Sequence, residues 1–403
     1  MTDTILVINA GSSSIKFALY DSTIVSEGPL ISGKITGIGR APDFIACDAR
    51  GQPLEDNGLG AIEKSATHDE LILRLLEWIS NHGQGTRLVA VGHRVVHGGR
   101  VFTDPVVISA DVMEELGKLT SLAPLHQPHN LAAIRAISDW ASGLPQVACF
   151  DTSFHRSQPR LAQLFALPRA LSDAGVIRYG FHGISYQYIA KLLPEYLGAR
   201  ADGRVVVAHL GNGASLCAMK QRCSIASSMG FTALDGLMMG QRCGSLDAGV
   251  VLYLLQNQAM SIEQVEHLLY RESGLLGVSG ISNNMQVLHD SPDPHAREAI
   301  ELFCYRAAGE LGLLLSPLQG LDAIVFTAGI GENAVLVRQL ICDHLAWLGV
   351  ELDQAANNTN ATRISSPNSK IDVLVIPTNE EAVIAEATHT LIANSQIEIG
   401  ASG

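Results

Sequence analysis

Residues 5–20 read ILVINAGSSSIKFALY, in which two apolar segments flank a six-residue turn of small and polar residues. The two segments together contain several β-branched residues, and the pattern predicts a β-hairpin. Gly11 and three successive serines bring backbone N–H groups and hydroxyls close together, so the turn can curl around an anion that Lys16 also reaches. An ordinary serine-rich hairpin would have the same residues, so this stretch alone leaves both interpretations open.

Length and composition favour an α/β protein of two domains. The chain has 403 residues, too many for one compact core. Aliphatic residues and glycine are frequent and aromatics are few, as in proteins whose parallel strands are buried on both faces. The formal net charge of −13 argues against a nucleic-acid partner, and an anionic substrate would need locally placed Lys and Arg.

The seven cysteines form no CxxC pair, and several lie in apolar segments, which predicts buried free thiols in a reducing compartment. The N-terminus does not have the pattern of a signal peptide, and no apolar run approaches the ~20 residues that span a bilayer. We therefore expect a cytoplasmic protein with no membrane partner.

Residues 88–99, LVAVGHRVVHGG, predict a buried strand that leads into a glycine turn. An arginine at the end of such a strand, Arg94, is seldom there for packing. His93 and His97 have the spacing of a helical zinc pair, but on a strand that spacing separates them by roughly 13 Å. A zinc site is therefore disfavoured.

Further polar residues follow predicted loops and strands. His126 and His129 lie in a proline-bounded loop before a helix predicted at 131–141, where we expect a substrate-facing loop instead of a metal site. Asp151 follows the strand predicted at 146–150, and α/β folds bind ligands at the carboxyl ends of strands. A helix N-cap is the alternative role for this carboxylate.

The opening pattern recurs in the second half of the chain. Residues 205–219 again form an apolar segment, a glycine turn at 211–213 and a second apolar segment, so we expect two related halves. Upstream, His182 stands in the glycine-bracketed turn RYGFHG before a helix predicted at 185–197. Downstream, the long glycine-rich loop at 227–244 contains one cation, Arg242.

The last third alternates helices and strands. Helices are predicted at 246–259, 262–271 and 295–315, besides one at 68–81 in the first half. A strand at 322–327 leads into AGIGENA, which favours a phosphate or nucleotide site but also matches GxGxxA with Glu351 twenty residues later. A Rossmann dinucleotide site is therefore an open alternative. A strand at 371–376, the turn PTNEE and a helix to about 393 end the chain.

Eight segments occur in an order that resembles the acetokinase family, the acetate, propionate and butyrate kinases: NAGSSSIK, GHRVVHGG, CFDTSFH, RYGFHG, HLGNGAS, MGFTALDGLMMGQR, TAGIGEN and PTNEE. The resemblance extends from residue 9 to residue 381. It implies two ribonuclease-H-like domains of the sugar kinase and actin superfamily, with an active-site cleft between them, in a homodimer. The implied N-terminal domain is 1–151 completed by a C-terminal helix at 383–403, and the nucleotide-binding domain is 152–382.

The activity that the resemblance implies is closest to that of the acetate kinases: reversible, Mg²⁺-dependent transfer of a phosphoryl group from ATP to acetate, which gives acetyl phosphate and ADP. Mn²⁺ is an alternative metal. A propionate kinase or a broad short-chain acyl kinase is the alternative activity. No nucleic-acid or membrane partner is implied.

The resemblance also implies roles for individual residues. Asn9 and Glu380 would hold the metal. Catalysis would depend on Arg94, Asp151, His182 and Arg242, with Asp151 orienting an arginine or holding a proton. The acid would be bound by Arg94, Val96, Leu125, His126 and Phe181. The nucleotide and its phosphates would contact Ser12, Ser14, Lys16, His209, Leu210, Gly211, Asn212, Gly213, Asn284, Met285, Gln286, Gly329, Ile330, Gly331, Glu332 and Asn333.

Several positions depart from the family pattern, among them two sites that lead to predictions. Asn284-Met285-Gln286 stands where the family usually has Asp-x-Arg, which removes both charges and predicts relaxed nucleotide selectivity. Ala233 stands where the family often has proline, which predicts a wider alkyl pocket and acceptance of propionate.

Two rival functions remain. A nicotinamide-dependent oxidoreductase would explain the GxGxxA match, but not the hairpin turns or the two arginines. A non-catalytic, ATP-driven module of the same fold would hydrolyse ATP without stimulation by acetate.

Overall fold

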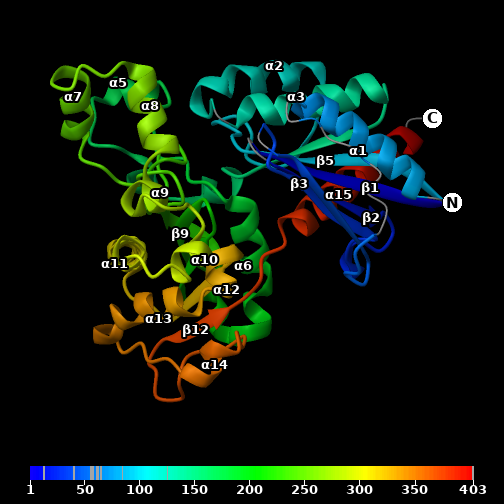
Figure 1. Cartoon of the computed structure of the whole chain (residues 1–403). Helices are drawn as coiled ribbons and strands as arrows, with labels where there is room; N and C mark the ends of the chain where they lie inside the picture. Colours follow the sequence, from blue (N-terminus) through cyan, green and yellow to red (C-terminus); the bar gives the residue numbers. More distant parts are fainter. Residues whose placement is uncertain are drawn as a thin grey trace. The chain divides into compact units, whose positions relative to one another are not determined.

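The structure, a computed structural model, describes residues 1–11, 14–39, 41–54, 59, 63, 66–83, 85–124 and 126–401, and the side chains as far as residue 394. It consists of two compact units (Figure 1). Unit 1 is Met1–Ser153 with Asn379–Gly403, and unit 2 is Phe154–Thr378. The domain boundaries implied by the resemblance, after residues 151 and 382, stay a prediction.

The opening stretch forms the predicted hairpin. Strands β1 (Thr2–Ala10) and β2 (Ser14–Asp21) are antiparallel, with Ile8 opposite Phe17 and Asn9 opposite Lys16. Apart from the exposed Thr2, the β-branched and aromatic side chains of both strands are almost entirely buried, which is the environment that favours such residues in strands.

Unit 1 contains a seven-stranded sheet with the order β4-β3-β2-β1-β5-β7-β6. Strands β1, β5 and β7 are parallel to one another, and β2 and β3 continue the sheet as antiparallel neighbours. The strands besides β1 and β2 are β3 (Ile31–Thr36), β4 (Asp43–Asp48), β5 (Thr86–Val95), β6 (Val106–Val107) and β7 (Gln146–Phe150).

Helix α1 (His68–His82) begins at a capping box, in which Thr67 accepts from the backbone N–H of Glu70 while the Glu70 carboxylate accepts from that of Thr67. Its apolar face joins β1, β2, β5 and α3 in one core. Helix α3 (Gln127–Trp140) begins four residues before the predicted start, because Pro128 is tolerated in a first helical turn. Helix α2 (Ala110–Lys118) packs against α3.

Helix α15 (Glu380–Ala401) packs against β1, β5 and β7 and extends beyond residue 393, where the helical pattern was predicted to end (Figure 1). Gly92 of β5 permits the close approach, since a β-carbon there would lie 2.6 Å from Cγ2 of Ile384 and would also collide with Thr388. Val91 belongs to the core with α1, so Gly92 and Arg94 lie on the opposite face of the sheet, the one that α15 covers.

Unit 2 contains a five-stranded sheet with the order β10-β9-β8-β11-β12. Its second hairpin, predicted from the sequence, pairs β8 (Arg204–Leu210) with β9 (Ala214–Lys220). The remaining strands are β10 (Cys223–Ser227), β11 (Ala323–Thr327) and β12 (Asp372–Val375). Both sheets contain a three-stranded antiparallel ladder followed by two parallel strands, which confirms the prediction of two related halves.

Helix α6 (Gly183–Leu197) shares a core with β8, β9, β11 and β12, and α11 (Pro294–Leu318) packs against β8, β9 and β10. Several helices were not predicted, among them the short helices α9 (Gly274–Ser279) and α10 (Met285–His289). The other helices of unit 2 are α4 (Arg160–Gln163), α5 (Arg169–Asp173), α7 (Ala248–Gln256), α8 (Ile262–Arg271), α12 (Ala328–Asn333), α13 (Val335–Asp343) and α14 (Gln354–Asn358).

None of the helices that the structure describes has the length and apolar character needed to cross a membrane. All seven cysteines are free thiols, and four of them, Cys149, Cys217, Cys304 and Cys342, are buried.

Candidate active site

Strand register brings polar residues of unit 1 into a row. Asn9 is paired with Lys16 across the β1–β2 hairpin, so both side chains lie on the same face of the sheet. Ile8 is paired with His93 on β5, which places Arg94 beside Asn9. Asp151 follows β7 directly, at the carboxyl end of the parallel strands, where α/β folds bind their ligands.

Arg94 is held in a bidentate ion pair with Asp151. Its Nε and Nη2 donate to the two carboxylate oxygens of Asp151 at 3.0 and 2.5 Å, and Nη1 donates to Oδ1 of Asn9 at 3.2 Å. The Asp151 side chain is only 1% exposed. Burial would lower the pKa of Arg94, but the charges of Asp151 and of Glu380, 3.8 Å away, outweigh it and raise that pKa. The guanidinium is therefore permanently charged and fixed in direction.

Asn9 and Glu380, the two predicted metal residues, contact each other. Nδ2 of Asn9 donates to Oε2 of Glu380 at 3.3 Å, and Glu380 is the first residue of α15. Carboxylate and amide oxygens are ligands that Mg²⁺ prefers, and this ion keeps several waters and phosphate oxygens, so two protein ligands fit it. No group of three or more His, Cys, Asp or Glu residues among the described positions could hold a metal.

Two residues of unit 1 that are predicted to bind the acid lie on different elements. His126 is the N-cap residue of α3, and Val96 is buried directly after β5. Asn130 was not predicted: its Oδ1 accepts from the backbone N–H of Val96 at 3.0 Å, and its Nδ2 donates to the carbonyl of Ala10 at 2.7 Å. It thus ties the ends of β1 and β5 together. Leu125 lies outside the described residues.

Gly11, the first described residue after β1, is contacted from α1. Nε2 of His68 lies 2.7 Å from the carbonyl oxygen of Gly11, and the His68 ring stacks on His129 at 4.3 Å. Gly11 donates its backbone N–H to the carbonyl of Ser14, the first residue of β2. Ser12 lies outside the described residues.

In unit 2, His182 is the N-cap residue of α6 and has a φ of 57°. A left-handed conformation is uncommon for a residue with a β-carbon and concentrates at functional sites. Its Nδ1 lies 2.8 Å from Oγ of Ser215, and its ring stacks on His209 at a centroid distance of 4.2 Å. The Phe181 side chain before it is buried.

Arg242 and His182 converge on the second glycine turn. A β-carbon on Gly213 would lie 3.3 Å from both Nη2 of Arg242 and Nε2 of His182. Arg242 also donates from Nη1 to the carbonyl of Ala233 at 2.7 Å. Glycine at position 213 therefore leaves room for two side-chain nitrogens beside the turn.

The rest of this turn is also fixed. Leu210 ends β8, and Gly211 donates its backbone N–H to the carbonyl of Gly213. The backbone carbonyl of Asn212 accepts from Gly240 at 3.0 Å, which joins the turn to the loop that contains Arg242.

In the segment 284–286, predicted to bind the nucleotide, two side chains form hydrogen bonds within the segment or with its helix. Oδ1 of Asn284 caps α10 by accepting from the backbone N–H groups of Gln286 and Val287, and the amide of Gln286 donates to both oxygens of Asp290. Met285 is buried.

The segment after β11 forms the short helix α12, which contains Gly329, Ile330, Gly331, Glu332 and Asn333. The Glu332 carboxylate accepts from the backbone N–H groups of Ala328 and Thr378, at 2.7 and 3.1 Å. Nδ2 of Asn333 donates to the carbonyl of Gly329. Glu332 therefore joins α12 to the segment after β12.

Four hydroxyl residues around the stacked histidines were missed. Ser215 contacts Tyr186, and Nδ1 of His209 lies 2.8 Å from Oγ of Ser185, which contacts Thr378. Their sequence signal is weak, since only the helical spacing of Ser185 and Tyr186 after His182 points to them.

Three histidines are buried in a neutral form. Burial lowers the pKa of His93, His97 and His155 to about 4. Nε2 of His93 lies 2.7 Å from Oε1 of Gln146, and His155 contacts Ser224 and the carbonyl of Phe181. These bonds indicate structural roles.

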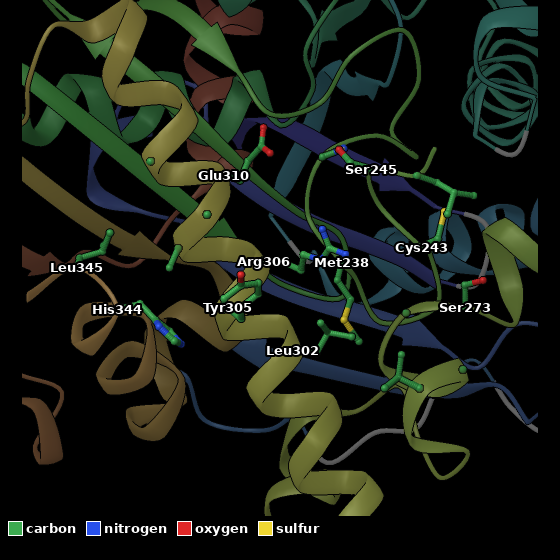
Figure 2. Close-up of a pocket in the computed structure, with 18 of the residues that line it drawn as sticks. Met238, Cys243, Ser245, Ser273, Leu302, Tyr305, Arg306, Glu310, His344 and Leu345 are labelled. Atoms are coloured by element: carbon green, nitrogen blue, oxygen red, sulfur yellow. The ribbon is translucent and has the colours of Figure 1, made fainter. Parts of the chain in front are cut away.

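A cavity of about 790 Å³ lies elsewhere in unit 2. Tyr305, Arg306 and Glu310 line it from α11, opposite His344 and Leu345 (Figure 2). No predicted site residue lines it, although Cys243 follows Arg242 in sequence. The cavity and the polar cluster around Gly213 are therefore different places.

Comparison with known proteins identifies the family. The sequence model described as the Acetokinase family matches residues 4–386. The chain belongs to the acetokinase family. Among acetokinase relatives, an acetate kinase of Rhodopseudomonas palustris (strain ATCC BAA-98 / CGA009) is 54% identical over 96% of this chain and 97% of its own length. One of Methylocella silvestris is 47% identical over 97% of this chain and 98% of its own length.

Solved acetokinase structures have the same fold. A propionate kinase from Francisella tularensis matches with a TM-score of 0.89 and 36% identity, covering 96% of this chain and 99% of its own. The acetate kinase of Porphyromonas gingivalis matches with a TM-score of 0.84 and 33% identity, covering 97% and 100%. The two-sheet α/β fold predicted from the sequence is thereby confirmed.

Proposed function

We propose that this acetokinase-family chain transfers a phosphoryl group reversibly from ATP to acetate in a Mg²⁺-dependent reaction, which gives acetyl phosphate and ADP. The observation that carries the proposal is the convergence of Arg242 Nη2 and His182 Nε2 beside the turn at Gly213. Two fixed nitrogen donors with no side chain between them suit the oxygens of a phosphoryl group. The names of the relatives support the same activity.

The chemistry needs charge compensation more than a base. A carboxylic acid is already ionised at neutral pH, so the acceptor needs no strong base, but it must approach a polyanion. Arg94 and Arg242 suit this task, because guanidinium groups bridge carboxylate and phosphoryl oxygens and never lose their charge. We assign about 3–5 kcal/mol of barrier lowering to each, the range of preorganised electrostatic contacts. Asp151 orients Arg94, a role that their bidentate contact supports.

Asn9 and Glu380 would hold Mg²⁺, with Mn²⁺ as a substitute. When bound, this ion neutralises phosphate oxygens of the nucleotide. Lys16, Ser12 and Ser14 would contact the phosphates. The turn of residues 209–213, the segment 284–286 and α12 would bind the nucleotide.

Acetate is the proposed main substrate, and we expect propionate to be accepted. Val96, Leu125, His126 and Phe181 would surround the alkyl group. Ala233 is smaller than the proline usual in the family, and one or two extra methylenes change binding by only about 1–3 kcal/mol each. A propionate kinase or a broad short-chain acyl kinase is the second candidate, favoured by this alanine and by the structural match to a propionate kinase.

The decisive experiment is to trap the acyl phosphate with hydroxylamine as the hydroxamate. Purified protein is incubated with ATP and Mg²⁺ and with acetate, propionate or butyrate. Hydroxamate formation with acetate supports the proposal, and the ratio of the acids decides between its two forms. Slow ATP hydrolysis that acetate does not stimulate would instead indicate a non-catalytic module. Saturable binding of a reduced nicotinamide cofactor, followed by its fluorescence, would indicate the oxidoreductase.

We also propose a homodimer in the cytoplasm. Helix α7, AGVVLYLLQ, has no buried residue, and Leu252 and Tyr253 on it are 54% and 51% exposed, which supports an interface there. The seven free thiols support a reducing compartment. Light scattering should give twice the chain mass of 42.9 kDa, and Leu252→Glu should reduce it to one chain.

A further inference from the structure

Two stacked imidazoles in unit 2, those of His182 and His209, are each hydrogen-bonded to a series of hydroxyl groups, called a hydroxyl chain below. From His182 the chain runs from Nδ1 to Oγ of Ser215 at 2.8 Å and on to the phenol of Tyr186 at 2.5 Å. From His209 it runs from Nδ1 to Oγ of Ser185 and on to Oγ1 of Thr378, both at 2.8 Å. Ser215 and Tyr186 are fully buried, so bulk water does not reach either group.

We propose that Tyr186 and Ser215 are positioning residues that fix His182 as the neutral tautomer with its proton on Nε2. This inference rests on the proposed function, in which Nε2 of His182 faces the transferring phosphoryl group. Only the Nε2–H tautomer can donate a hydrogen bond there while the ring is uncharged.

The direction of the chain follows from the acidity of its members. A phenol has a pKa near ~10, so it is a better donor than an aliphatic hydroxyl. Tyr186 therefore donates to Ser215, whose single proton must then point at Nδ1 of His182. Nδ1 accepts this bond, and the ring proton is confined to Nε2.

The geometry at His182 makes this arrangement useful. The left-handed backbone at His182 and its stacking on His209 fix the ring plane, and Nε2 lies on the side of Gly213 and Arg242. A fixed ring with the wrong tautomer would present a lone pair to an anion and repel it. The hydroxyl chain removes that tautomer.

The hydrogen-bonded hydroxyl groups at His209 can be compared with those at His182 in the same protein. Both of its hydroxyls, on Ser185 and Thr378, are aliphatic, so acidity gives this chain no preferred direction. We therefore expect a Tyr186→Phe change to alter the tautomer of His182 and to leave that of His209 unchanged.

The first test is spectroscopic and needs no activity. Two-bond proton–nitrogen correlation spectra of protein labelled with ¹⁵N-histidine distinguish the two neutral tautomers, and His182→Gln identifies the His182 signals. The proposal expects the Nε2–H form in the native protein and a mixture of tautomers in Tyr186→Phe. An Nδ1–H or doubly protonated His182 in the native protein overturns it, whether or not the protein makes acyl phosphate.

The second test is kinetic. Tyr186→Phe should lower kcat about five- to tenfold, the effect of one lost neutral hydrogen bond, with KM for ATP and acetate unchanged. The matched control is Tyr179→Phe, which removes a phenol that donates to the carbonyl of Gly175 and should leave kcat unchanged. Equal rates for Tyr186→Phe and the native protein, or a change in KM alone, would contradict the proposal.

Discussion

The two hairpins of this chain differ in the residue pair that lies one step from the turn. In unit 1 this pair is Asn9 and Lys16, and Arg94 stands on the next parallel strand. In unit 2 it is His209 and Ser215, and Thr327 stands on the next parallel strand. The same strand order thus presents charged groups in one unit and hydroxyl and imidazole groups in the other.

The difference shows what each kind of group needs in order to be held rigidly. The partly buried guanidinium of Arg94 is held by carboxylates, with Asp151 in contact and Glu380 at 3.8 Å. Neutral imidazoles require only hydroxyls, which add no charge. We therefore expect changes in unit 1 to affect both stability and turnover, and changes around the imidazoles to affect mainly turnover.

The largest effect should come from removing the cation of unit 1. Arg94→Ala should lower kcat/KM by about a thousandfold or more, since it removes about 4 kcal/mol of electrostatic stabilisation. It should also destabilise the fold by about 3–5 kcal/mol, because Asp151 stays buried with its charge uncompensated. Steady-state kinetics and urea denaturation measure the two effects.

The matched control is Arg87→Ala on the same strand, where an exposed arginine pairs with Asp3. It should change activity by less than about twofold. Arg94→Lys, which retains the charge but loses the bidentate contact, is expected to fold and still to lose most activity. Full activity in a folded Arg94→Ala protein would show that turnover does not depend on the charged group of unit 1.

The next effect tests how Arg94 is oriented. Asp151→Asn is nearly isosteric but removes the carboxylate in bidentate contact with the guanidinium, and we expect kcat to fall about a hundredfold. Asp322→Asn is the control, since Asp322 also holds an arginine, Arg204, in a bidentate pair. The two variants are compared in the hydroxamate assay. Turnover of Asp151→Asn at the native rate would show that Arg94 needs no fixed partner.

A third prediction concerns neutral histidines, which both units bury. The pKa of His93 in unit 1 and of His155 in unit 2 is about 4, against an ordinary 6.5, because burial disfavours the charged ring. Unfolded protein therefore takes up protons first as the pH falls below about 6.5. Each buried neutral ring should therefore contribute fully to the free energy of unfolding above pH 6.5. This contribution should decrease as the pH falls toward 4, by about 2 kcal/mol at pH 5.

Urea denaturation at several pH values tests this. His93→Gln should be less stable at pH 7 but should lose less stability between pH 7 and pH 5 than the native protein. His295→Gln, at an exposed histidine, should leave the pH dependence unchanged. If the slope is the same in all three proteins, His93 is not kept neutral by burial.

The hairpins and the individual buried strands could be predicted from the sequence because short apolar segments and the turn residues between them indicate them. Turn residues between β-branched segments specify a hairpin whatever surrounds it. The start of α3 was misplaced because Pro128 was taken as a boundary, whereas proline is well accommodated in a first helical turn. Helices α9 and α10, of six and five residues, are too short to show a helical period.

The residues around the site were harder to find than the site residues themselves. Arg94 stands out in the sequence because a cation ends an apolar strand. Asn130, Ser215 and Tyr186 do not, since serine and tyrosine are ordinary in a strand and a helix, and their partners lie 29 to 120 residues away. Only the packing of α6 on β8 and β9, and of α3 on β1, brings these groups together.

The smallest expected effect concerns segment 284–286 of unit 2, which contains no charged residue. We expect relaxed nucleotide selectivity, and the double variant Asn284→Asp, Gln286→Arg should lower KM for ATP about three- to tenfold relative to GTP and pyrophosphate. Aspartate can take over the capping role of Asn284 at α10, so the helix should be preserved. Asp290→Asn alone is the control, because it alters the carboxylate that binds Gln286 without adding a cation. A native protein that already binds ATP tightly and excludes GTP would contradict this prediction and would mean that uncharged contacts are sufficient for nucleotide selectivity. Unit 2 would then differ from unit 1, with its charged groups, at the nucleotide site as well as at the imidazoles.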